Sequence, residues 1–265
     1  MKFRRMRIVV LITGLLFAGS LARAAESGNS SVAILLNRGD RLFRSMNNAG
    51  ALQAYLEAEK LAPTDYAVLV RLSRVNNDMG RLLLRKSPDA ESYYRSAIAY
   101  AERLRSQYPD SAETWFYLAL CHGSLVPFKS LGEKLELSHD VRANAERALA
   151  IDSSFAMAHV ILGVYYRGVA RLGWFERTIV NGILGKNLGG TYEEAEQHLR
   201  RALVLDPDNP YAHFELSWVY RATGRMDDAK AELQIVLTIP PTCQREQLQR
   251  DDAERMLQRL ATGTH

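Results

Sequence analysis

Six histidines, one Gly-Lys pair and two cysteines are the residues whose types could support catalysis or metal binding. A phosphate-binding loop needs Gly five residues before its own Gly-Lys and Ser or Thr directly after it. Around Gly185-Lys186 those positions hold Val180 and Asn187. The histidines, at positions 122, 139, 159, 198, 213 and 265, form no His-Glu-x-x-His pattern, and no Gly-x-Ser-x-Gly elbow occurs. The sequence therefore predicts a protein that is not an enzyme and holds no metal or cofactor.

The charge balance of the chain argues against a protein that binds nucleic acid. Of the 265 residues, 47% are apolar and 24% charged, which is ordinary globular composition. The formal net charge is +4, but residues 1–24 hold five of the 34 Lys and Arg residues and none of the 30 acids. Without that segment 29 bases face 30 acids, so the remaining chain is near −1. We expect no nucleic-acid partner.

The N-terminal residues resemble an export signal. A basic stretch from Lys2 to Arg7 precedes an apolar run over 8–17, and Ala22-Arg23-Ala24 supplies the small residues that a signal peptidase reads. We predict a signal peptide over 1–24, cleaved after Ala24, a short linker over 25–31, and a periplasmic or secreted protein. The alternative is an uncleaved helix that anchors the chain in the inner membrane. No later segment is apolar for long enough to span a bilayer, so any other membrane contact is peripheral.

A repeat of about 34 residues organises the rest of the chain. In its first copy, small residues stand where two helices of a unit must approach closely, and Pro63 ends the unit because it cannot continue a helix. The pattern runs Leu35, Gly39, Leu42, Met46, Ala51, Tyr55, Ala58, Pro63. This spacing predicts paired amphipathic helices joined by a turn.

Five such units fill residues 32–243. They cover 32–65, 66–111, 112–155, 156–209 and 210–243, and we expect the excess of the three middle units to lie between the two helices of each. Residues 244–265 read as a polar capping helix and tail. The expected fold is an all-α solenoid of five helix-turn-helix repeats with inserts.

This pattern resembles the tetratricopeptide repeat (TPR), and several segments narrow the resemblance. They are Trp115-Phe116-Tyr117-Leu118-Ala119-Leu120-Cys121-His122-Gly123, Leu172-Gly173-Trp174-Phe175-Glu176 and Tyr192-Glu193-Glu194-Ala195. Together they are similar to the regulator of microtubule dynamics family and its bacterial relatives, over about 66–260. The resemblance implies a TPR domain that binds proteins and, in some relatives, lipid. An exported bacterial protein would not meet microtubules, so that property is not carried over.

The first helices of stacked units line a concave groove, and residues between their packing positions should face it. Arginines there can pair with carboxylates, and aromatic residues are common interface anchors. The candidate groove residues are Arg74, Phe116, Arg167, Tyr211, Phe214, Trp218 and Arg221. They predict an adaptor or scaffold that binds an acidic or amphipathic segment of a protein partner. Two alternatives stay open: the aromatic residues pack against the preceding unit, or the arginines only form surface pairs.

The longest insert, about 171–190, adds an apolar stripe. The candidate residues are Leu172, Trp174, Phe175, Ile179 and Ile183. The insert could cover the groove as a lid, touch a membrane surface or thicken the core. As a lid it would make the protein a carrier of a lipid or other small amphiphile, with a possible role beside a transport system, which is the alternative function. Cys121 and Cys243 lie two units apart, so we expect two free thiols.

Overall fold

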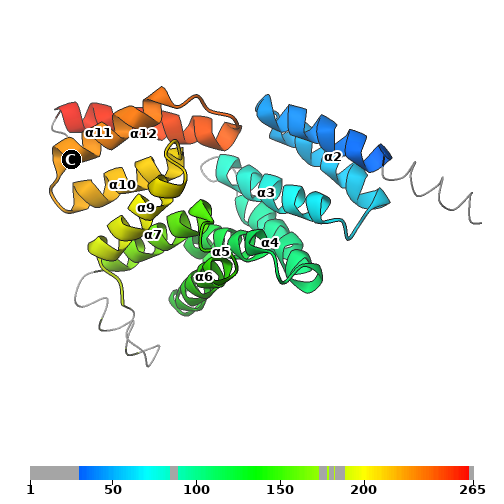
Figure 1. The fold of residues 1–265 in the computed structure, drawn as a ribbon, viewed down its shortest axis with the longest axis horizontal. Coiled ribbons are helices and arrows are strands. Elements are labelled where there is room, and N and C mark those ends of the chain that lie inside the picture. Colours follow the sequence, from blue (N-terminus) through cyan, green and yellow to red (C-terminus); the bar gives the residue numbers. More distant parts are fainter. Residues whose placement is uncertain (1–29, 84–88, 173–177, 179–181, 183–188, 263–265) are drawn as a thin grey trace, which may run out of the picture.

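All regular structure in the described part of the chain is helical. The computed structural model describes residues 30–83, 89–172, 178, 182 and 189–262 (Figure 1). The prediction of an all-α solenoid is confirmed for these ranges. A first helix covers 30–44. It is followed by α2 (Asn48–Leu61), α3 (Tyr66–Leu83), α4 (Ala90–Gln107), α5 (Ala112–Leu125), the 3-10 turn η1 (Val126–Phe128), α6 (Leu131–Ile151), α7 (Ala156–Ala170), α9 (Tyr192–Leu205), α10 (Pro210–Ala222), α11 (Met226–Thr238) and α12 (Gln244–Thr262).

The helices stack as antiparallel pairs whose members touch at small residues. An added Cβ on Gly39 would lie 2.3 Å from the Tyr55 ring, and one on Gly163 would lie 2.5 Å from Leu199. The repeat alanines on the second helices are fully buried. They are Ala51, Ala58, Ala97, Ala101, Ala145, Ala148, Ala195, Ala202 and Ala229. Close approach at these points explains why small residues recur there from one unit to the next.

The extra residues of the middle units are partly built into longer helices, which differs from the expectation that they lie between the helices. In the second unit α3 and α4 each have 18 residues, against 14 in α2. In the third unit α6 has 21 residues. Added helical turns satisfy their own backbone hydrogen bonds, so a helix can lengthen into solvent more readily than an irregular loop can be buried.

Local signals fix several helix ends. The Thr191 hydroxyl accepts a hydrogen bond from the Glu194 N–H, and the Glu194 carboxylate accepts one from the Thr191 N–H, a capping box that starts α9. Asn209 caps α10, and Pro210 occupies its first turn. After α10 the chain turns through Gly224 at φ +80°, a conformation that costs glycine little.

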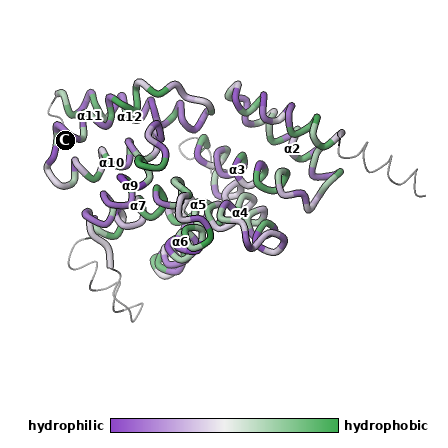
Figure 2. Tube along the Cα trace, in the orientation of Figure 1, coloured by the Kyte–Doolittle hydropathy of each residue, from purple (hydrophilic) through white to green (hydrophobic). Residues whose placement is uncertain are grey.

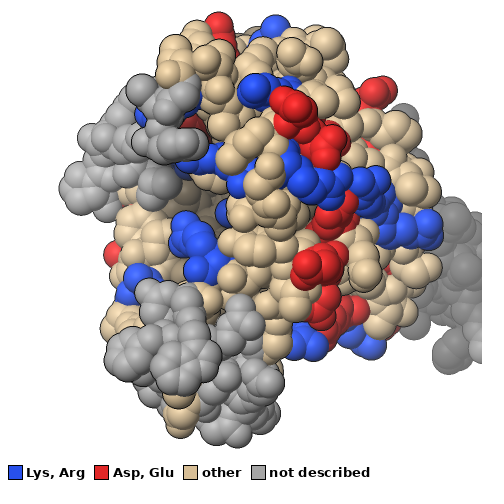
Figure 3. Space-filling view, turned by 90° about the vertical axis from the view of Figure 1, so that its left-hand side faces the viewer, with Lys and Arg blue, Asp and Glu red and all other residues tan. Residues whose placement is uncertain are grey.

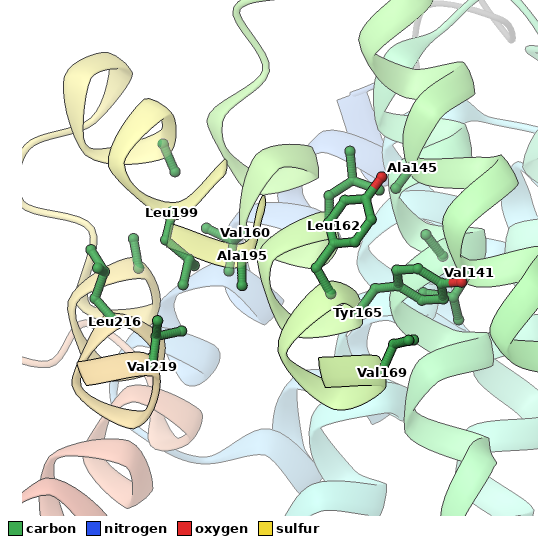
Figure 4. Packing of buried hydrophobic residues seen from close by; sticks show 14 of the residues in the cluster. Val141, Ala145, Val160, Leu162, Tyr165, Val169, Ala195, Leu199, Leu216 and Val219 are labelled. Carbon is green, nitrogen blue, oxygen red and sulfur yellow. The ribbon is translucent and has the colours of Figure 1, made fainter. Parts of the chain in front are cut away.

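The largest core cluster lies between the third, fourth and fifth pairs. Figure 4 shows Leu162 and Tyr165 of α7 between α6 on one side and α9 and α10 on the other. Along each helix apolar and polar stretches alternate, as expected when one face packs and the other meets water (Figure 2). Both cysteines are free and buried, which confirms the prediction of two thiols.

Helix α12 packs on α10 and α11, as a cap should, and then reaches back to the start of the stack. Its Arg245 pairs with Asp78 of α3, and its Asp252 pairs with Arg81 of the same helix. Cys243, one residue before α12, packs in the N-terminal cluster with Val32. The stack is therefore closed by its own last helix, which lies between α11 and the first helices in Figure 1. No helix within the described ranges is long and apolar enough to cross a membrane.

Candidate binding pocket

Three side chains of α10 form the centre of the candidate site. Phe214 and Trp218 meet edge to face with ring centroids 6.4 Å apart. The guanidinium carbon of Arg221 lies 5.3 Å from the Trp218 ring centre, and that of Arg167, from α7, lies 5.9 Å from it. Trp218 is thus flanked by two cations, a geometry in which the ring face is held by cation–π attraction.

These side chains line a cavity of about 710 Å³ between five helices. Its lining residues are Arg81 of α3, Arg167 of α7, Arg171, Tyr192 of α9, Phe214, Trp218, Arg221 and Ala222 of α10, and Asp252, Arg255, Met256, Arg259 and Leu260 of α12. A volume of this size fits a segment of a few residues or a small organic molecule. The pocket is therefore large enough for a specific ligand.

The pocket carries a strong excess of positive charge. Six of its lining residues are arginine, and Asp252 is the one acid among them in the described part of the chain. Arg81 and Arg255 pair with Asp252, and Arg167 pairs with Glu215 at 2.8 Å. The other three arginines form no ion pair with a described carboxylate. Figure 3 shows Lys and Arg side chains gathered in a hollow on this face. Such a pocket attracts anionic groups.

Four of the seven predicted groove residues meet in this pocket: Arg167, Phe214, Trp218 and Arg221. Phe214 and Trp218 also pack against the cluster formed by α11 and α12, not against the preceding unit. Phe214 and Trp218 thus combine packing on α11 and α12 with exposure to the cavity, whereas the alternative predicted packing against the preceding unit.

The remaining three predicted residues lie elsewhere. Phe116 is only 7% exposed and packs against Phe155, with ring centroids 5.4 Å apart, so it belongs to the core and offers no surface to a partner. Arg74 stacks on Phe43 at 4.2 Å and lies 3.8 Å from Asp40. These contacts engage Arg74 within the fold.

Tyr211 is covered by the closing helix. Arg245 of α12 lies over its ring at 5.1 Å, and burial raises the pKa of the Tyr211 hydroxyl well above its usual value. Burial likewise raises the pKa of Asp78, and the neighbouring Arg245 and Arg74 offset part of that shift. This end of the expected groove is therefore filled by the protein itself.

The candidate residues of the insert fall mostly outside the described residues. Trp174, Phe175, Ile179 and Ile183 lie there, and only Leu172, two residues after the end of α7, is described. Whether the insert covers the groove, contacts a membrane or thickens the core stays a prediction.

Three of the described histidines make hydrogen-bonding contacts within the fold: His159, His198 and His213. The Nδ1 atoms of His159 and His198 lie 3.0 Å apart, and burial lowers the pKa of both imidazoles. Burial lowers the pKa of His213 as well, but hydrogen bonds to Glu232 and to the Pro207 carbonyl outweigh it and raise the net value. Within the described ranges, no group of three or more His, Cys, Asp or Glu side chains is placed to hold a metal ion.

Sequence reasoning missed the part of the pocket that α12 supplies. Its five residues belong to the predicted polar capping helix, and Arg81 is not among the predicted groove residues. The available signal was the charge pattern of α12, whose Asp252, Arg255 and Arg259 recur every three or four residues and so share one helix face. That pattern predicts a charged face on α12, but it does not predict which other helices this face contacts.

Paired helices stacked into a solenoid define a helical-repeat protein with a TPR-like scaffold fold. The family model of regulator of microtubule dynamics proteins 1–3 matches residues 35–261, and the chain belongs to this family. It is 24% identical over 177 residues to regulator of microtubule dynamics protein 1 of Bos taurus, covering 66% of this chain and 54% of that protein. It is 22% identical over 234 residues to protein 3 of Rattus norvegicus, covering 87% and 50%. The chain spans about half the length of these relatives.

A solved structure supports the same fold. TTC0263, a thermophilic TPR protein of Thermus thermophilus, superposes with a TM-score of 0.61 and 19% identity, covering 84% of this chain and 99% of that one. The predicted TPR-type fold and the resemblance to the regulator of microtubule dynamics family are thereby confirmed.

Proposed function

We propose that this protein is an exported, non-catalytic adaptor that binds an acidic or amphipathic segment of a protein partner. The observation that carries the proposal is the pocket of about 710 Å³ with six arginines around Phe214 and Trp218. Arginine pairs with carboxylates through two parallel hydrogen bonds, and a neighbouring aromatic surface takes an apolar side chain of the same segment. The TPR-type fold and the family support a binding role.

Affinity capture from a cell-envelope extract tests the adaptor function. Reversing two pocket charges, Arg221→Glu with Arg259→Glu, is expected to reduce recovery of partners at least about tenfold, because the anion would then meet like charge. Arg95→Glu with Arg105→Glu is the matched control, since both side chains are exposed on α4 and outside the pocket. The same partners recovered equally with both variants would contradict the proposal.

Export rests on the N-terminal sequence. Intact-mass measurement of the protein from the native host is expected to show a chain that begins at Ala25, because the small residues before it form the cleavage site. Ala24→Arg should block the cleavage and leave the precursor with the membrane fraction. A wild-type mass that includes residues 1–24 would favour the anchored alternative.

Carriage of a small amphiphile is the second candidate. It is supported by the combination of arginines with the apolar side chains of Trp218, Met256 and Leu260 in one cavity. Native mass spectrometry of the purified protein separates the two functions: a mass without ligand favours the adaptor, and a co-purified amphiphile favours carriage.

A further inference from the structure

Asp252 occupies the basic pocket from within. Its two carboxylate oxygens accept hydrogen bonds from different arginines: Oδ2 from Arg81 at 3.1 Å, and Oδ1 from Arg255. The side chain is 18% exposed and comes from α12, whereas Arg81 comes from α3. One carboxylate therefore joins two arginines that are 174 positions apart in the chain.

This arrangement is the one that the carboxylate of a bound ligand would adopt. An incoming acidic group gains most from arginines that are already held in place, because less side-chain freedom is then lost on binding. Arg81 and Arg255 are held in this way and remain partly exposed, but their charge is already shared with Asp252. An anion that approaches them also meets the negative charge of Asp252 itself.

Three other arginines of the pocket could bind an acidic group first. Arg171, Arg221 and Arg259 line the same cavity, and none of them pairs with a described carboxylate. An acidic group can bind there without displacing a carboxylate of the described residues. A ligand with several adjacent acidic groups can bind these arginines first and then compete at Arg81 and Arg255 at high local concentration. A ligand with one acidic group has no such advantage.

We propose that Asp252 is an internal competitor for the anion site and sets its specificity, so that the pocket selects segments with several neighbouring acidic side chains beside an apolar one. The proposal rests on the proposed function, since it concerns the same pocket. The apolar residue is part of the ligand because Phe214, Trp218 and Met256 line the wall beside the arginines. Because of Asp252, a partner segment needs more negative charge to bind in the pocket.

Binding of one defined probe tests this. The probe is a fluorescein-labelled, acetylated peptide Glu-Glu-Phe-Glu-Glu, and the readout is fluorescence anisotropy with the full chain. Asp252→Asn is expected to tighten binding at least about fivefold, because it removes the competing charge and leaves two arginines for the ligand. A purely structural role of Asp252 predicts weaker binding, since the substitution also removes one of the two ion pairs between α12 and α3.

Asp251→Asn is the matched control. Asp251 is the neighbouring acid on α12, accepts a hydrogen bond from Gln247 at 2.8 Å and does not line the pocket. Asp251→Asn changes the net charge of the protein by the same amount as Asp252→Asn, and its affinity for the probe should stay within about twofold of the wild type. Circular dichroism and thermal unfolding of both variants confirm that they remain folded. Binding by Asp252→Asn that is weaker than, or equal to, that of Asp251→Asn would overturn the proposal.

The experiment separates this inference from the proposed function. If the wild type binds the probe and Asp252→Asn binds it no better, internal competition is wrong and the basic pocket remains a binding site. If Asp252→Asn binds and the wild type does not, the competitor is stronger than assumed and the inference stands. If neither binds up to millimolar concentration, both the inference and the acidic-segment function fail.

Discussion

Asp78→Leu is expected to lower the free energy of unfolding by about 3 kcal/mol, because it leaves Arg245 without its partner in the interior. The Nη1 atom of Arg245 lies 3.4 Å from Oδ1 of Asp78, and the two side chains are 26% and 3% exposed. Urea denaturation followed by circular dichroism measures the change. The loss is expected chiefly at the junction of α3 and α12, since this pair joins the last helix to the second unit of the stack.

Two comparisons show whether burial is the cause. Asp78→Leu combined with Arg245→Leu should be more stable than Asp78→Leu alone, because replacing both charges by apolar groups removes the unpaired cation. Arg38 and Glu57 form a pair at the same 3.4 Å distance, but their side chains are 57% and 48% exposed. Glu57→Leu should cost less than about 1 kcal/mol. Equal losses at the two sites would show that the buried pair has no special role.

Gly163→Ala is expected to destabilise the protein by about 1–3 kcal/mol through overpacking. The new Cβ would lie 2.5 Å from Cγ and 2.7 Å from Cδ2 of Leu199, and 3.3 Å from the carbonyl oxygen of Ala195. Leu199 has no exposed surface and belongs to the largest core cluster, so it has no free space into which to move. Thermal and urea unfolding of the purified variant measure the loss.

Gly168→Ala in the same helix is the control for this prediction. An added Cβ on Gly168 meets nothing within 4 Å, and the residue is exposed. Because alanine is the better helix former, Gly168→Ala should leave stability unchanged or raise it by up to about 1 kcal/mol. Two glycines of α7 should therefore respond with opposite sign. A loss at Gly168 as large as that at Gly163 would contradict the packing explanation, because an added Cβ at Gly168 meets no neighbouring atom.

Much of the fold was predictable because the residues conserved in spacing from unit to unit are those that contact each other within one unit. Gly39 and Tyr55, or Gly163 and Leu199, lie in the same unit, and one small residue must face one large one for the helices to approach. The pattern repeats, so each copy supports the others. Helix lengths were less predictable, because the repeat spacing does not say whether the extra residues of a unit extend its helices, as in α3 and α6, or form a loop between them.

The candidate site was predictable only where it lies on a repeat. Arg167, Trp218 and Arg221 follow from the positions between packing residues on α7 and α10, and the pocket contains all three. The same rule placed Phe116 in the groove, but there it failed, because Phe155 at the start of α7 covers that side chain. The position of a residue on its helix predicts the side to which its side chain points. Whether that side chain stays exposed depends on residues of another unit, such as Phe155 here.

By itself the sequence determined the stack of helix pairs, since periodic spacing of small and apolar residues encodes contacts between residues close in the chain. Only the tertiary structure decided where the stack ends. The small rotation of each unit on the last accumulates over five pairs, and it brings α12 against α3, so that Arg245 meets Asp78 and Asp252 meets Arg81. Those contacts join residues more than 160 positions apart, and no local pattern specifies them.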